Sequence, residues 1–141
     1  IRLFYTYGAG QKSNCLINQI YRCSLGDEDM NLSPCEHYRD YIHVSDVANG
    51  IVKLLNVNGS CTVNLGSGSA IKLKIFVEQL WIGLGANPAR LIFGAHEQPS
   101  LEQSQPKAFA DISKLEKLTG WTPELTIKDG IEITVKQLGN T

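Results

Sequence analysis

The chain has 141 residues, of which 43% are hydrophobic and 19% charged, a composition typical of one globular domain with a sizeable core. Its 13 basic and 14 acidic residues leave a net charge of -1 without a basic cluster, so we expect neither nucleic acid nor a membrane surface as a partner. No apolar run approaches the roughly 20 residues that cross a bilayer, and no signal peptide opens the chain, so we expect a cytoplasmic protein.

The first predicted element is a strand over residues 1–6, where large apolar side chains alternate with other residues. Gly8 and Gly10 then allow the backbone turns that leave a strand. The chain begins inside this apolar segment without an initiator Met, which is typical of a part of a longer protein. Apolar residues at helical spacing next predict a helix over residues 13–25, which Gly26 ends.

Two short extended segments follow, at residues 30–33 and 41–44, and the second leads into a helix. Ser45 is predicted to cap this helix, because its hydroxyl can accept a free backbone N–H at the helix start. Asp46 complements the helix dipole, and the apolar residues through Leu55 form one face.

A second principal strand is predicted at residues 61–65, which are β-branched and apolar. The strands at 1–6 and 61–65 enclose a helix, so they can pair in parallel through a right-handed crossover. Gly66-Ser67-Gly68 closes the second strand. This segment lacks the glycine spacing and the later acid of a dinucleotide fingerprint, so we interpret it as a structural turn.

The rest of the chain is predicted as helices with one short strand between them. Periodic apolar residues and capping patterns place their ends. The predicted elements are a helix over 73–84 ended by Gly85, a strand at 92–93, a helix from Asp111 through Leu118, and a helix over 127–138 opened by a capping box of Thr126 and Asp129.

Strands that alternate with helices predict an α/β fold, in which ligands bind beyond the carboxyl ends of the strands. Arg39 directly precedes the strand at 41–44 and has two interpretations. It could be a surface residue paired with Asp40 or Asp46. Alternatively, its planar guanidinium could clamp a diphosphate through two parallel hydrogen bonds.

The cysteines and histidines do not indicate a metal site. The four cysteines are irregularly spaced without a Cys-x-x-Cys pair, so we expect reduced, structural thiols. A zinc site built from Cys35, His37 and His43 lacks the paired spacing that such sites show. His43 falls within a predicted strand and is interpreted as structural, whereas His96 lies in a loop where it could contact a substrate.

One segment of the chain reads Arg39-Asp40-Tyr41-Ile42-His43-Val44-Ser45-Asp46-Val47-Ala48-Asn49-Gly50-Ile51. It resembles the matching stretch of the extended short-chain dehydrogenases, the NAD-dependent epimerase/dehydratase family of nucleotide-sugar enzymes. Residues 1–11 resemble that family's sixth Rossmann strand with its Tyr-Gly-Pro-Gly exit, although Ala9 replaces the proline. Residues 63–68 resemble its seventh strand. The last resemblance, to the family's ending, is carried by Asp111 to Leu115, by Gly120-Trp121-Thr122-Pro123 and by Gly130-Ile131.

These four motifs follow the family's order over essentially the whole chain, but in the family they lie past mid-chain. The resemblance therefore implies the C-terminal half of such an enzyme. The implied fold is α/β, with the last strands of a Rossmann-type parallel sheet and a small α/β substrate-binding domain. Residues 1–10 and 41–68 would belong to the Rossmann domain, and residues 11–40 and 69–141 to the substrate-binding domain.

The resemblance also implies roles for particular residues. Arg39 matches the arginine that binds the nucleotide diphosphate, and residues 30–33 match the extended piece that packs on the nucleobase. Tyr5 stands where the family commonly has a substrate-contacting Asn. The loop after the strand at 92–93 lacks the family's second phosphate-binding arginine, so Lys107 could contribute instead. The implied substrate-binding residues are Arg39, Met30, Asn31, Leu32, Tyr5 and His96.

The family's chemistry is transient hydride transfer with NAD or NADP at C4 of a nucleotide-linked hexose. No glycine-rich dinucleotide turn occurs in this chain, and no Tyr has a Lys four residues on. We therefore expect no catalytic residue here, cofactor binding mainly by other residues, and no activity of the chain alone. The complete enzyme is expected to be a homodimeric nucleotide-sugar epimerase, 4,6-dehydratase or 4-keto-reductase, with residues 91–121 most similar to reductases and epimerases such as those of abequose formation.

The competing hypothesis is a non-catalytic remnant, or a nucleotide-binding or interaction module without a reaction. The upstream coding sequence distinguishes the two. A frame that carries the glycine-rich turn and a Tyr-x-x-x-Lys pair favours the enzyme, and a start codon close to Ile1 favours the remnant.

Overall fold

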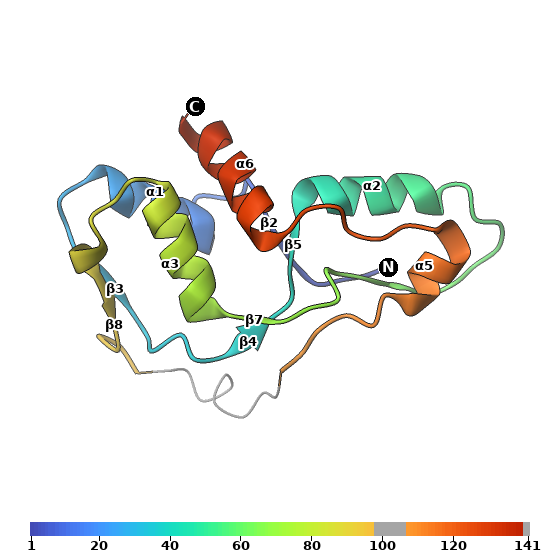
Figure 1. The fold of residues 1–141 in the computed structure, drawn as a ribbon, viewed down its shortest axis with the longest axis horizontal. Coiled ribbons are helices and arrows are strands. Elements are labelled where there is room, and N and C mark those ends of the chain that lie inside the picture. The colour runs from blue at the N-terminus through green and yellow to red at the C-terminus, as the bar shows by residue number, and fades with distance from the viewer. Residues whose placement is uncertain (98–106, 140–141) are drawn as a thin grey trace.

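The computed structural model describes residues 1–97 and 107–139 (Figure 1). Its strands are short: Arg2–Leu3 (β1), Tyr5–Tyr7 (β2), Met30–Leu32 (β3), Tyr38–Arg39 (β4), Tyr41–His43 (β5), Asn64–Leu65 (β6), Ile71–Lys72 (β7) and Leu91–Phe93 (β8). Its helices are Leu16–Leu25 (α1), Val44–Leu54 (α2), Leu73–Gly83 (α3), Pro88–Arg90 (η1, a 3-10 turn), Ser113–Thr119 (α5) and Ile127–Gly139 (α6).

The predicted first strand lies between two partners. β1 pairs in parallel with β6, with Leu3 opposite Leu65, and β2 pairs in parallel with β5, with Tyr5 opposite Tyr41. The N–H of Phe4 donates to the Leu65 carbonyl on one edge (3.0 Å), and that of Tyr5 donates to the Asp40 carbonyl on the other (3.1 Å). The parallel pairing of residues 1–6 with 61–65 and the α/β fold class are thus confirmed.

Two further strand pairs build the part of the chain around α1 and α3. β3 pairs in parallel with β8, which the sequence predicted only as separate extended segments. β4 pairs antiparallel with β7, with Arg39 opposite Ile71. Neither β4 nor β7 was predicted, because two residues are too few to show the alternation of a strand. This pair places Arg39 beside the start of α3.

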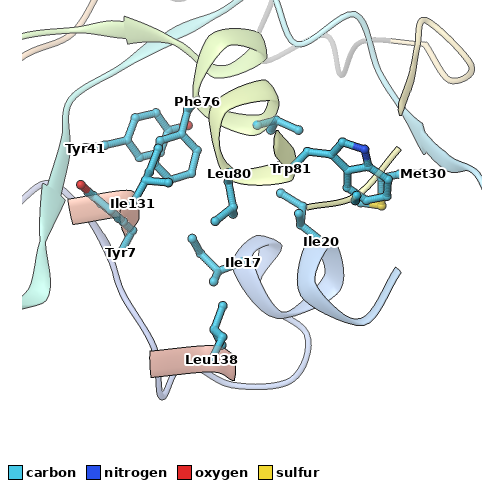
Figure 2. Close-up of a cluster of buried hydrophobic side chains, with 12 residues drawn as sticks. Tyr7, Ile17, Ile20, Met30, Tyr41, Phe76, Leu80, Trp81, Ile131 and Leu138 are labelled. Atoms are coloured by element: carbon cyan, nitrogen blue, oxygen red, sulfur yellow. The ribbon is translucent and has the colours of Figure 1, made fainter. Parts of the chain in front are cut away.

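The larger hydrophobic core packs α1, α3 and α6 against β2 and β5 (Figure 2). We call it the first core; its members include Trp81, Phe76, Leu80, Ile17, Ile20, Tyr7, Tyr41, Ile131 and Leu138. The Trp81 indole N–H donates to the Asn87 carbonyl (2.9 Å), so the ring is buried with its polar group satisfied. Each such side chain contributes about 1.5–3 kcal/mol through burial of its apolar surface.

A second core lies under α2, towards the other end of the molecule's long axis (Figure 1). It consists of Ile42, Val47, Val63, Leu65, Leu115 and Trp121. Gly50 lets α2 approach closely, because a Cβ there would lie 2.6 Å from Leu65 Cδ1 and 3.2 Å from Trp121 Cε2. Leu115 and Trp121 come from the range predicted as substrate-binding domain, yet they pack with the Rossmann strands. The division into two domains stays a prediction.

The predicted cap of α2 was wrong. The helix begins at Val44, and its N-cap is His43, whose ring Nδ1 accepts the Ser45 N–H (3.2 Å). β5 runs directly into the helix, so no residue is left between them for a separate serine cap. His43 thus has a local structural role, as the sequence predicted.

The predicted cap of α5 is displaced by one residue. The N-cap is Ile112, which makes no side-chain capping hydrogen bond, and the preceding Asp111 accepts the Ser113 N–H (3.0 Å). Thr126 and Asp129 form the capping box of α6, because the Asp129 N–H donates to the Thr126 hydroxyl (3.2 Å) and the Thr126 N–H donates to the Asp129 carboxylate (3.1 Å). In the part of the chain that the structure describes, no helix is long and apolar enough to cross a membrane.

Candidate functional site

A cavity of about 310 Å³ opens between β2, β4, β5, α1 and α3. This volume is at the small end of the range for ligand pockets. Its aromatic lining comprises Tyr5, Tyr7, Tyr41 and Phe76, and its polar lining comprises Thr6, Gln11, Cys15, His37 and Arg39. Aromatic walls with a few polar groups are typical of a site for an organic ligand.

Among the described residues that line this cavity, Arg39 is the one that carries a formal charge. Its side chain is only 4% exposed, and its Nη1 donates to the Tyr38 carbonyl (2.8 Å). Pairing of Arg39 with Ile71 holds its backbone in place. A buried guanidinium that faces a cavity favours an anion there, because an uncompensated buried charge is costly.

Tyr5 lies against Arg39 in the wall of this cavity. The Arg39 Cζ atom is 5.4 Å from the centroid of the Tyr5 ring, a cation–π distance. Tyr5 is 53% exposed, so its ring covers the guanidinium from the solvent side of the cavity. Behind it, Tyr41 is stacked on Phe76 with ring centroids 4.2 Å apart, which gives this wall a rigid aromatic backing.

The other predicted substrate residues lie outside this cavity. Met30 is 9% exposed and belongs to the first core (Figure 2), so its side chain is not available to cover a nucleobase. Asn31 is exposed and Leu32 is half-buried. The Leu32 carbonyl accepts the Ala95 N–H (2.9 Å) and the N–H of the exposed His96 (3.4 Å). The structure therefore gathers β3 and His96 into one group, and Arg39 and Tyr5 into another.

Asp40 is fully buried and does not pair with Arg39. One carboxylate oxygen accepts the Ser67 N–H (2.7 Å) and hydroxyl (2.6 Å), and the other accepts the N–H groups of Gly68 (3.0 Å) and Ala110 (2.9 Å). Gly66 is required there, because a Cβ would lie 2.8 Å from Asp40 Oδ2. Gly66-Ser67-Gly68 is thus a structural turn, as predicted, and the surface ion pair of Arg39 with Asp40 is not formed.

Asp46 has a second role beyond its position in the first turn of α2. Its two carboxylate oxygens accept the N–H groups of Glu124 and Leu125, each at 3.1 Å. The alternative ion pair of Arg39 with Asp46 is therefore also not found. Sequence reasoning missed both carboxylate functions, because each depends on backbone groups about 27 to 79 residues away in the chain.

Tyr7 is not suited to act as a base. Burial raises the pKa of its hydroxyl, and the nearby carboxylates of Asp46 and Asp129 raise it further. The hydroxyl donates to the Ile127 carbonyl (3.4 Å), which links β2 to the start of α6. Tyr7 therefore stays protonated and has a structural role.

His43 makes stability depend on pH. Its Nε2 is buried without a hydrogen-bond partner in the part of the chain that the structure describes, and burial lowers the pKa of its imidazole against the opposing effect of Asp46. The unfolded chain thus binds a proton more readily near about pH 6.5 than the folded chain does. We expect stability to be highest above that pH and to fall as the pH drops through it.

Urea unfolding of the parent chain and of His43→Asn at about pH 8 and about pH 5.5 measures this effect. Asparagine keeps an acceptor for the Ser45 N–H but does not titrate. The loss of stability on acidification should be smaller in His43→Asn. An equal loss in both proteins would show that His43 is not responsible.

Lys107 does not take part in the Arg39 site. Its ammonium lies 4.4 Å from the centroid of the Tyr38 ring. Tyr38 and Arg39 are neighbours in β4, and successive side chains of a strand point to opposite faces. Lys107 is not among the described residues that line the cavity, so the suggestion that it replaces a second phosphate-binding arginine has no support in this geometry.

His37, Gln11 and Cys15 are cavity residues that the predicted substrate set did not include. His37 is 8% exposed, and its carbonyl accepts the Leu73 N–H at the start of α3 (2.9 Å). The sequence could have indicated His37 as a site residue, because it lies two residues before Arg39 and side chains two apart in an extended segment share a face.

The chain is similar to several known proteins. A family model described as GDP-mannose 4,6 dehydratase matches residues 1–134. UDP-glucuronic acid decarboxylase 1 of Xenopus tropicalis is 29% identical over 140 residues, which cover 95% of this chain and 31% of that protein. CDP-abequose synthase of Salmonella typhimurium strain LT2 is 30% identical over 144 residues, which cover 98% of this chain and 47% of that protein. The chain thus spans about a third to a half of the length of these relatives.

A solved structure shows the same fold. dTDP-glucose 4,6-dehydratase from Bacillus anthracis, in complex with NAD, superposes with a TM-score of 0.84 and 21% identity over 99% of this chain and 44% of that one. The two chains therefore share the arrangement of strands and helices described above.

Proposed function

Because the chain belongs to the GDP-mannose 4,6 dehydratase family of extended short-chain dehydrogenases, we propose that it is the substrate-binding part of an NAD(P)-dependent nucleotide-sugar epimerase, dehydratase or 4-keto-reductase. The observation that carries the proposal is the buried guanidinium of Arg39 in the wall of an aromatic cavity. No acidic residue lines this cavity among the described residues, so the site presents net positive charge. A nucleoside diphosphate carries the complementary charge and an apolar-faced ring.

In this proposal Arg39 binds the diphosphate with its planar fork of N–H donors. Tyr5 covers the same part of the cavity and contacts the sugar side of the ligand. The β3 segment contacts the nucleobase through the backbone of Met30, the side chain of Asn31 and the half-buried Leu32, with His96 beside it. These roles support binding and orientation of the substrate.

Within the part of the chain that the structure describes, the glycine turn after β6 is not a cradle for the cofactor's diphosphate. In the glycine turn after β6, the N–H groups of Ser67 and Gly68 already donate to the Asp40 carboxylate, so they are not free for phosphate oxygens. The Bacillus anthracis structure holds NAD, and a Pseudomonas aeruginosa structure with this fold holds NADPH. We propose that NAD or NADP is bound mainly by residues outside this chain.

The chain alone is expected to bind nucleotide sugars without converting them, because it has no proton-transferring Tyr-x-x-x-Lys pair. The pure chain is incubated with NAD or NADP and with UDP-glucose, CDP-glucose, GDP-mannose or dTDP-glucose, and products are separated by chromatography. A complete enzyme of the family serves as the positive control. Product formation by the chain alone would contradict the absence of catalytic residues, and failure to bind any of the sugars would contradict the proposed function.

A further inference from the structure

His37 lies in the wall of the same cavity as Arg39. Its side chain is more than nine-tenths buried, and its backbone is held by the hydrogen bond from the Leu73 N–H. Arg39 is held two residues later by its pairing with β7. The two side chains therefore line one cavity from a segment whose backbone is held, so that little conformational entropy would be lost on binding a ligand there.

The charge of the cavity does not match the proposed ligand when His37 is neutral. Each phosphate of an esterified diphosphate carries a negative charge, whereas Arg39 supplies a single positive charge in the described lining. An imidazolium beside the second phosphate would balance the ligand and would donate a charge-assisted hydrogen bond. Without the ligand, the nearby guanidinium disfavours a second positive charge on this wall.

We propose that His37 is a second diphosphate contact that binds as an imidazolium, so that ligand binding takes up a proton from solvent. This inference rests on the proposed function of the Arg39 cavity. It concerns substrate binding and its pH dependence, and it gives His37 no part in the hydride-transfer chemistry.

An imidazole ordinarily changes charge near neutral pH, and the other titratable groups around His37 are of other types. Tyr5, Tyr7 and Tyr41 line the cavity from β2 and β5, and Cys15 lines it from the start of α1. Glu36, the preceding residue, forms an ion pair with Lys72 of β7 (2.6 Å). Lys74 of α3 lies over the Phe93 ring (4.9 Å). The Asp40 carboxylate is occupied by its four donors from residues 67, 68 and 110.

Calorimetry of the full chain tests the inference with the tightest binder among UDP-glucose, CDP-glucose, GDP-mannose and dTDP-glucose. Their esterified diphosphates do not titrate in this range, so a pH effect comes from the protein. We expect binding to be about tenfold tighter at about pH 6 than at about pH 8. Titrations in two buffers of different ionisation enthalpy should show proton uptake at the higher pH.

Variants separate His37 from its neighbours. His37→Gln should bind weakly at both pH values without proton uptake, and His37→Lys should bind equally at both because its charge does not depend on pH in this range. Arg22→Ala is the control for a change of charge elsewhere in the chain, because Arg22 is exposed and is not among the described lining residues. Cys15→Ser checks that a thiol does not cause the effect. Both variants should keep the parent pH profile.

The outcomes distinguish the inference from the proposed function. If the parent binds a nucleotide sugar and His37→Gln keeps the same pH profile and proton uptake, the inference fails and the proposed function stands. If no nucleotide sugar binds, both fail.

If His37→Gln does not fold, NMR of the parent decides, because its three histidines give separable ring signals. Ligand should then raise the titration midpoint of the ring assigned to His37, and an unchanged midpoint would overturn the inference.

Discussion

Replacing Asp40 with alanine is expected to lower the free energy of unfolding by about 3 kcal/mol or more. The substitution removes the acceptor of the Ser67, Gly68 and Ala110 N–H groups. Ala110 is buried and the other two are half-buried, so water replaces the lost hydrogen bonds only in part. The loop after β6 would then lose its attachment to the segment that leads into α5.

Urea unfolding followed by circular dichroism measures this loss. Asp40→Asn should be nearly as unstable, because its amide would turn a donor towards one or more of the backbone donors. Asp29→Ala is the matched control; Asp29 is exposed, so we expect a change within about 0.5 kcal/mol. A loss below about 1 kcal/mol in Asp40→Ala would show that the four hydrogen bonds contribute little.

Replacing Arg39 with alanine is expected to weaken nucleotide-sugar binding by about one to two orders of magnitude. A hydrogen bond to a charged group contributes roughly 1.5–3 kcal/mol, and alanine removes both the charge and the planar fork. Arg39→Lys keeps the charge but not the planar fork, so its affinity for the nucleotide sugar should lie between those of the parent and of Arg39→Ala. In the complete enzyme that we propose, the affinity for NAD or NADP should be nearly unchanged.

Titration calorimetry with the nucleoside diphosphate tests the contact directly, because this ligand carries the phosphates without the sugar. Arg22→Ala is the control, since Arg22 lies on the exposed side of α1 and away from the cavity. Binding by Arg39→Ala as tight as that of the parent would exclude the diphosphate role. Unfolding of Arg39→Ala would instead assign the arginine a structural role.

The sequence alone determined the features that depend on neighbouring residues. The apolar patterns over residues 13–25, 73–84 and 127–138 predicted α1, α3 and α6, because a helix repeats its buried face every three to four residues. The capping box of Thr126 and Asp129 also followed from spacing. The parallel pairing of residues 1–6 with 61–65 followed from strand order and the fixed handedness of crossovers.

Only the tertiary structure decided how the site is assembled. β4 and β7 are too short for a local signal and form because each meets the other across more than 30 residues. That pairing brings Arg39 and His37 to one cavity wall beside Tyr5. It is also long-range packing that buries Met30 in the first core and directs Asp40 and Asp46 to backbone groups far along the chain. The residue type determines which contacts a side chain can make, but the fold determines which of those possible partners lie close enough to be contacted.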